Sequence, residues 1–101
     1  MATLTVLYPA AGTRFDRDYY AVHHSKAVHD AWDSAGLTSM TVTYGEGALG
    51  GGDAPFHVIT TLSFASRAAL DAAVASPAAG PVFADIPNFT DATPIAMIGS
   101  A

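Results

Sequence analysis

The order of strand-like and helix-like segments constrains this chain more than any other feature. Alternating residues at 3–9 (TLTVLYP) predict a strand that ends at Pro9. Helical spacing then begins after an N-cap at Asp16 and continues to Ala35, where Gly36 ends it. The remaining segments are predicted as strands at 37–46 and 56–64, a helix at 66–76, a broken segment with one helical turn at 78–89, and a strand at 93–99. The order is strand, helix, strand, strand, helix, strand.

This order predicts an α+β fold of the ferredoxin-like type, β-α-β-β-α-β. In that arrangement a four-stranded antiparallel sheet carries two helices on one face. The chain has 101 residues, which is the size of one small domain, so residues 1–101 are predicted to form a single unit.

The two faces of the predicted sheet differ in composition, because side chains alternate along a strand. The face expected under the helices is large and apolar: Leu4, Val6, Tyr8, Met40, Val42, Tyr44, Phe56, Val58, Leu62 and Phe64. The opposite face carries no charge: Thr5, Leu7, Ser39, Thr41, Thr43, His57, Ile59, Thr61 and Ser63. A sheet face in water normally carries charged residues, so we expect a second copy to cover it in a two-fold homodimer. A threonine-rich face open to water is the alternative.

Charge and composition exclude several classes of partner. The chain has a net charge of −5 and only four basic residues, which argues against binding to nucleic acid or to anionic membranes. It has no cysteine, so disulfides, thiolate metal sites and a cysteine nucleophile are excluded. No signal peptide and no membrane-spanning run are recognised, and we expect a cytoplasmic protein.

The segment FDRDYYAVHH, residues 15–24, holds the strongest candidate site. On a regular helix Tyr20 and His24 share the inward face with Asp16 one turn earlier, and alanines continue that face. Imidazole titrates near neutral pH and tyrosine hydroxyls can polarise a carbonyl, so this group suits acid–base catalysis. Small alanines would leave room for a ligand between helix and sheet.

A plainer interpretation stays open for the same residues: Asp16 caps the helix, Tyr20 packs, and His24 is a hydrogen-bonded core residue. Adjacent His23 and His24 project about 100° apart and cannot readily share one metal. The sequence requires no cofactor, although spacing does not exclude a haem held by one axial histidine.

Two separated motifs carry a resemblance to a known family. FDRDYYAVHH after TVLYP, and ADIPNFTDATPIAMIG at the end, resemble motifs of the EthD family, and LSFASRAALDAAVASPA is also similar. The matching positions are Phe15, Asp16, Tyr19, Tyr20, His24, Asp85, Pro87, Asn88, Phe89, Thr90 and Asp91.

The resemblance implies a dimeric α+β barrel with a ligand cleft between helices and sheet. The family is associated with ethyl tert-butyl ether degradation and is often labelled oxidoreductase, and its wider superfamily includes cofactor-free monooxygenases and polyketide cyclases. Lys26 stands where the family usually has proline, which predicts a more regular helix.

Together these features predict a small-molecule enzyme that acts on an aromatic or polyketide-like compound. His24 would be the acid–base group and Tyr20 would assist it, while Asp16 would tune the histidine by charge. The ligand would contact a set of aromatic residues: Tyr8, Tyr44, Phe56, Phe64, Trp32 and Phe89. The alternatives are a non-catalytic binder of a hydrophobic ligand, and a structural dimer whose cleft is filled by its own side chains.

Overall fold

The computed structural model describes all residues 1–101 and has a four-stranded antiparallel sheet in the order β2-β3-β1-β4. The strands are β1 (Ala2–Pro9), β2 (Leu37–Tyr44), β3 (Phe56–Phe64) and β4 (Ile95–Ser100). The two central strands, β1 and β3, pair with each other along nearly their whole length. The ferredoxin-like α+β prediction is therefore confirmed, with β4 starting two residues later than the sequence suggested.

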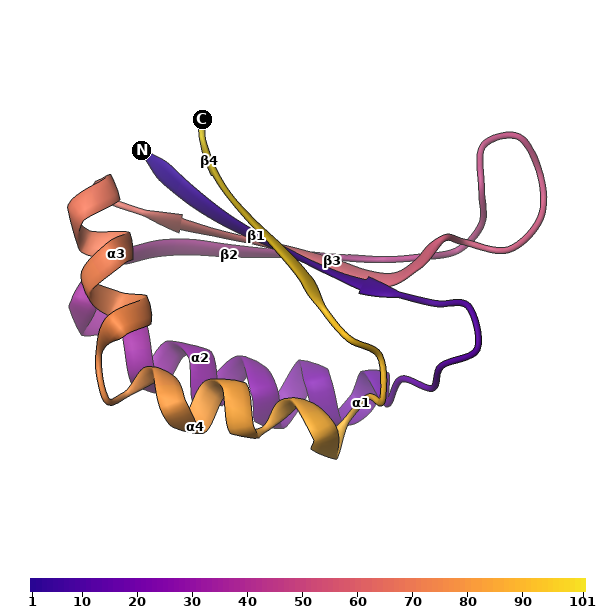
Figure 1. The fold of residues 1–101 in the computed structure, drawn as a ribbon, viewed down its shortest axis with the longest axis horizontal. Helices are drawn as coiled ribbons and strands as arrows, with labels where there is room; N and C mark the ends of the chain where they lie inside the picture. The colour runs from indigo at the N-terminus through magenta and orange to yellow at the C-terminus, as the bar shows by residue number, and fades with distance from the viewer.

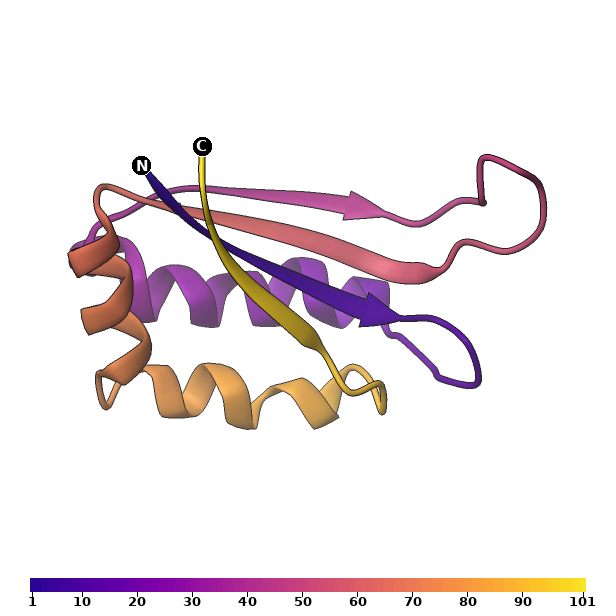
Figure 2. The same ribbon diagram turned by 45° about the horizontal axis from the view of Figure 1, so that its top comes forward.

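All helices lie on one face of the sheet (Figures 1 and 2). The first helical region comprises α1 (Arg17–Tyr19), a π-helical turn η1 (Tyr20–His24), α2 (Ser25–Trp32) and a 3-10 turn η2 (Asp33–Ala35). The second comprises α3 (Arg67–Ala75), α4 (Ala79–Ala84) and a 3-10 turn η3 (Ile86–Asn88). Helices α2 and α4 run side by side under the sheet, and α3 stands at one end (Figure 2). No helix is both long and apolar enough to span a bilayer.

The predicted helix boundaries follow from local hydrogen bonds. The Asp16 carboxylate accepts the Tyr19 backbone N–H at 3.0 Å, and the Ser66 hydroxyl accepts the Ala69 N–H at 3.0 Å. Both residues are N-caps that satisfy a backbone donor left unpaired at a helix start. Gly36 ends the first helical region at φ 103°, a backbone conformation that a side chain disfavours.

The prediction of a regular first helix is wrong. The Ser25 N–H donates to the Tyr20 carbonyl, which closes an i→i+5 turn in place of the α-helical i→i+4 turn. In an α-helix residues four apart drift by about 40° around the axis. The wider turn removes much of that drift, so residues at four-residue spacing all face inward: Tyr20, His24, Val28 and Trp32.

Because of this turn, the inward face of the helix is larger than the sequence predicted. Val28 and Trp32 extend the inward face beyond Tyr20 and His24 and are 2% and 1% exposed. The alanines expected at the centre, Ala27, Ala31 and Ala35, are only half-buried. The wall facing the sheet is thus built from bulky side chains, and small residues do not create the space beneath it.

The segment 78–89 is also more helical than predicted. Pro81 lies in the first turn of α4, and Pro87 lies in the first turn of η3. Proline is tolerated in a first helical turn, because its missing N–H would have no partner there. Gly80 and the two prolines therefore made a helical segment resemble a loop.

Two hydrophobic clusters fill the layer between sheet and helices. The larger surrounds Trp32, Phe64 and Leu70, and the smaller consists of Tyr8, Tyr20, Val58 and Phe89. The smaller cluster is aromatic and includes the first residues of the candidate site. It lies at the end of the sheet where the β1 strand leads into α1.

The strand prediction placed Phe56 on the helix-covered face of the sheet and His57 on the opposite face. A register shift in the pairing of β1 with β3, between Tyr8 and Pro9, makes both placements wrong. The His57 ring lies 5.5 Å from the Phe15 ring, and its Nε2 is 2.8 Å from the Thr13 hydroxyl oxygen. Phe56 instead borders a surface depression with Thr43 and Ile59, two residues of the uncovered face. An irregularity of one residue reverses the alternation on which the prediction depended.

The second sheet face has no helix over it and no charged residue in its rows. Thr5 pairs with Thr61 and Thr61 with Thr41, so a threonine row crosses three strands. The edge strand continues this face with Ile95 and Met97, which pair with Leu7 and Thr5 and are 55% and 58% exposed.

Candidate active site

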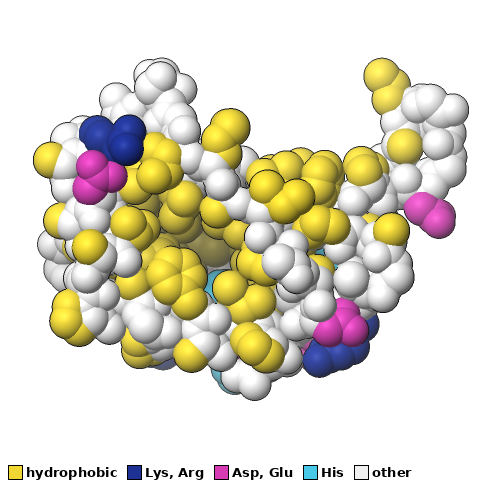
Figure 3. Space-filling model, in the orientation of Figure 1, with side chains coloured by type: hydrophobic (Ala, Val, Ile, Leu, Met, Phe, Trp, Pro, Cys, Tyr) yellow, Lys and Arg dark blue, Asp and Glu magenta, His cyan; other side chains and the backbone are white.

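A narrow apolar cleft lies between the helices and the sheet, with a cavity volume of about 40 Å³, and it is partly open to solvent. Figure 3 shows it as a hollow surrounded by hydrophobic side chains, with histidine visible at its edge. Eleven of its 13 lining residues are hydrophobic. The full set is Leu4, Val6, Tyr8, Tyr20, His24, Val28, Trp32, Met40, Thr60, Leu62, Val82, Phe83 and Ile86. None of these residues carries a formal charge when the imidazole of His24 is neutral.

His24 is held in the cleft wall by a carboxylate that comes from the other helical region. Its Nδ1 lies 2.9 Å from Asp85 Oδ2, and the two side chains are 4% and 15% exposed. An ionised carboxylate only accepts hydrogen bonds, so Nδ1 carries the proton and donates it to Asp85. Nε2 of His24 forms no hydrogen bond within the chain. Every fully buried polar side-chain atom of the protein does have a hydrogen-bond partner, so Nε2 is not fully buried. Nε2 therefore meets the open space of the cleft with its lone pair available.

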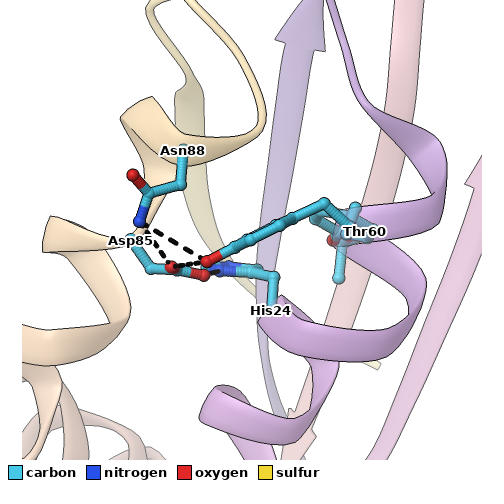
Figure 4. A network of polar contacts seen from close by, with 6 residues as sticks. His24, Thr60, Asp85 and Asn88 are labelled. Carbon is cyan, nitrogen blue, oxygen red and sulfur yellow. Dashed lines mark hydrogen bonds and ion pairs between the residues drawn. The ribbon is translucent and has the colours of Figure 1, made fainter.

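The other oxygen of Asp85 is occupied by two further donors (Figure 4). The Tyr19 hydroxyl donates to Oδ1 at 2.6 Å, and Asn88 Nδ2 donates to the same oxygen at 3.0 Å. Asn88 is tied to Asp85 a second time, because its backbone N–H donates to the Asp85 carbonyl at 3.0 Å. These contacts join α1, η1 and η3 at one end of the cleft.

The charge states of the pair follow from burial and hydrogen bonding. Burial lowers the pKa of His24 and outweighs the opposing effect of the Asp85 hydrogen bond and charge. Burial by itself would raise the pKa of Asp85, but the hydrogen bonds from Tyr19, Asn88 and His24 lower it further than burial raises it. At neutral pH the site therefore holds a neutral imidazole beside an ionised carboxylate.

Two buried tyrosines complete the polar part of the cleft. The Tyr20 hydroxyl is hydrogen-bonded to the Thr60 hydroxyl, and the Tyr20 ring stacks on the His24 ring with centroids 5.3 Å apart. Burial raises the pKa of Tyr20 to about 12 and also raises the pKa of Tyr8. Both phenols stay protonated and can donate a hydrogen bond to a ligand oxygen.

The predicted catalytic residues lie in different places. Tyr20 and His24 line the cleft, as expected. Asp16 does not pair with the histidine: its carboxylate is the N-cap of α1 and accepts the Tyr19 N–H. The carboxylate beside His24 is Asp85, 61 residues away in sequence.

The predicted ligand-contact residues divide into three groups. Tyr8 and Trp32 line the cleft. Phe64 and Phe89 are fully buried behind the lining, where Phe89 lies 4.6 Å from the His24 ring and supports it. Tyr44 and Phe56 lie outside the cleft, Tyr44 beneath the Arg17 guanidinium at 5.2 Å and Phe56 in the separate surface depression.

Asp85 and Asn88 were matched to the family motif but were not predicted as site residues. Asp85 and Asn88 belong to the ADIPN segment and are three residues apart. In a 3-10 helix, side chains at that spacing eclipse each other, which lets Asn88 reach Asp85. Thr60 had no comparable signal, since it occupies one position of a strand rich in threonine. No cluster of three or more potential metal ligands exists in the protein.

Comparison with known proteins identifies the family. The model of the EthD domain matches residues 9–93 of this chain. The chain belongs to the EthD family. An EthD-like protein from Ralstonia eutropha has a similar structure, with a TM-score of 0.88 and 26% identity over 98% of this chain and 89% of that one. An EthD family protein from Bacillus halodurans has a TM-score of 0.80 and 21% identity over 100% and 98% of the two chains.

More distant structures share the EthD fold. A putative antibiotic biosynthesis monooxygenase from Nitrosomonas europaea has a TM-score of 0.57 and 10% identity, over 100% of this chain and 98% of that chain. No curated protein matches the sequence. Family and fold together indicate an EthD protein of the small-molecule enzyme or ligand-binding type.

Proposed function

We propose that this EthD protein is an enzyme that moves a proton on an aromatic or polyketide-like compound bound in the helix–sheet cleft. One observation carries the proposal: His24 faces an apolar cleft through a free Nε2 while Asp85 holds its Nδ1. A neutral imidazole oriented in this way is a general base. The carboxylate orients the ring and stabilises the imidazolium that forms.

The reaction we favour is an isomerisation or ring closure that starts with proton removal. Nε2 takes a proton from a carbon next to a carbonyl, and the negative charge that develops on the carbonyl oxygen is stabilised by a tyrosine hydroxyl in the cleft. Tyr8 and Tyr20 are both protonated and both line the cleft. In an isomerisation, His24 then returns the proton at a different carbon. In a ring closure, the carbanion attacks a second carbonyl carbon of the same substrate, the π bond of that carbonyl breaks, and His24 returns the proton to its oxygen. Atoms and charge balance in both cases without a co-reactant.

The cleft lining supports an uncharged substrate. Apart from His24 and Thr60, its lining is hydrophobic, and it contains no lysine or arginine. A carboxylate or phosphate on the ligand would lose its hydration without gaining a counter-ion, which is costly. The nearby Asp85 charge and the net charge of −5 add to this penalty for an anion.

Two other functions remain as candidates for specific reasons. A binding protein could use the same cleft with Nε2 as a hydrogen-bond acceptor, and the narrow apolar lining suits that role as well. An oxidoreductase acting with dioxygen could start from the same base, because removing a phenolic proton makes an aromatic ring a better electron donor.

Turnover and binding can be separated with one variant and one internal reporter. Trp32 is the only tryptophan and lines the cleft, so its fluorescence reports ligand entry. His24→Asn retains a side-chain donor for Asp85 but removes Nε2. We expect ligands found by Trp32 quenching to bind wild type and variant similarly, and product formation to fall by at least about 100-fold in the variant. A folded His24→Asn protein with full activity would exclude His24 as the base.

We also propose that the protein is a homodimer through its uncharged sheet face. The threonine rows and the exposed Ile95 and Met97 support this assembly, because an open β-surface of this composition lacks the charges that normally keep it in water. The helices and the cleft would then lie on the outer side of each subunit.

A further inference from the structure

Asp85 has more hydrogen-bond donors than a simple partner of His24 requires. Tyr19 and Asn88 both donate to Oδ1, and neither of them lines the cleft. A carboxylate oxygen has two lone pairs, and these two donors occupy both on Oδ1. Only Oδ2 remains free for the His24 N–H, and it lies 2.9 Å from Nδ1.

We infer that Tyr19 and Asn88 are positioning residues that fix the Asp85 carboxylate, so that His24 keeps its proton on Nδ1 and its lone pair toward the cleft. This inference rests on the proposed function for its catalytic meaning, but its structural content concerns the tautomer of His24. Without both donors, the carboxylate could rotate about its χ2 angle and present either oxygen, or turn toward solvent.

The local fold explains why these two residues can act on one oxygen. Asn88 is three residues after Asp85 across the η3 turn, where side chains eclipse, and its own backbone N–H bonds the Asp85 carbonyl. Tyr19 reaches the same oxygen from the first helical region, 66 residues away in sequence. Its ring is stacked on Phe89 and packs at 4.9 Å on the His23 ring, which holds the hydroxyl in place.

The surroundings of His24 offer no substitute for this carboxylate. Among titratable groups, Asp85 contacts the Nδ1 side of the imidazole, and the phenols of Tyr20 and Tyr8 line the cleft with it. The Tyr20 hydroxyl is hydrogen-bonded to the Thr60 hydroxyl, and no other acidic or basic side chain forms a hydrogen bond or ion pair with the imidazole. If Asp85 turns away, His24 is left buried without an acceptor for Nδ1–H, and the two tautomers become comparable.

The test measures the imidazole of His24 directly by ¹H–¹⁵N NMR in Tyr19→Phe, Asn88→Ala and the double variant. Tyr19→Phe retains the stacked ring and removes only the hydroxyl. Tyr44→Phe is the matched control, since it removes a tyrosine hydroxyl that lies outside the network. The His24→Asn protein assigns the signal among the four histidines.

We expect the wild type and Tyr44→Phe to show one tautomer with the proton on Nδ1. Each network variant should show a mixture of tautomers and a lower His24 pKa, because the partner that opposes the effect of burial is misplaced. Where turnover is measured, kcat should fall on the order of tenfold per lost donor with KM nearly unchanged.

An unchanged tautomer and titration in the double variant would overturn the inference, even if the protein were less stable, because Tyr19 and Asn88 would then only tie two helical regions together. This outcome is distinct from failure of the proposed function, in which the tautomer changes as expected but no variant affects any turnover. Thermal unfolding of each variant shows that the NMR changes come from folded protein.

Discussion

At the scale of single residues, burying His24 beside Asp85 makes the stability of the protein depend on pH. The pKa of His24 is below its usual 6.5 in the folded chain, because burial disfavours the charged imidazole. The unfolded chain therefore binds a proton at a higher pH than the folded chain does. The free energy of unfolding therefore carries no penalty from His24 above about pH 6.5. It decreases as the pH falls from 6.5 toward the lower pKa of His24 in the folded chain.

We expect the free energy of unfolding of the wild type to fall between pH 7.5 and pH 5 more steeply than that of His24→Asn. The difference between their slopes is at most about 1.4 kcal/mol per pH unit, since one proton is involved. Asp85 does not contribute in this window, because its pKa is lowered from 3.8. Urea unfolding at several pH values measures both slopes, and parallel curves would contradict the burial effect assigned to His24.

At the scale of elements, the sequence was informative wherever structure depends on neighbours in the chain. Alternation identified four strands, and Asp16, Gly36 and Ser66 marked helix ends through local hydrogen bonds and backbone geometry. The π-turn at Tyr20–His24 has no comparable local signal in the sequence, although it decides which side chains of the first helical region are buried.

The candidate site was only half predictable for the same physical reason. Tyr20 and His24 are four residues apart, so helical spacing brought them together. Asp85 reaches His24 by folding of a segment 61 residues away, and spacing carries no information about that approach. The nearby Asp16 satisfied the sequence pattern, but in the structure its carboxylate is committed to a backbone N–H.

Two substitutions of Asp16 separate its role as a helix N-cap from the predicted role of tuning His24 by charge. Asparagine caps helices about as well as aspartate but has no charge, whereas alanine cannot cap. We expect Asp16→Asn to match the wild type in stability, and Asp16→Ala to lose about 1 kcal/mol in urea unfolding. The His24 titration followed by NMR should be the same in Asp16→Asn and wild type; a shift would mean that the Asp16 charge does reach the imidazole.

At the scale of the whole molecule, the two sheet faces have separate roles. One face is covered by helices that supply His24 from η1 and Asp85 from the end of α4. The other is uncharged and crossed by the row Thr5, Thr61 and Thr41. Since the cleft lies on the helix side of the sheet, association through the threonine face would not cover its lining residues.

A lysine placed in the centre of the threonine face tests the assembly. Thr61 lies on a central strand, between Thr5 and Thr41. Two copies meeting across a two-fold axis would bury two lysines without partners, which costs several kcal/mol and should dissociate the dimer.

Val22→Lys is the matched control, because Val22 is 63% exposed on the helical side and should accept the charge without effect. In sedimentation velocity we expect dimers for the wild type and Val22→Lys, and monomers for Thr61→Lys. A wild type that sediments as single chains would mean that this β-surface tolerates water without charge, and that the cleft is a property of one subunit alone.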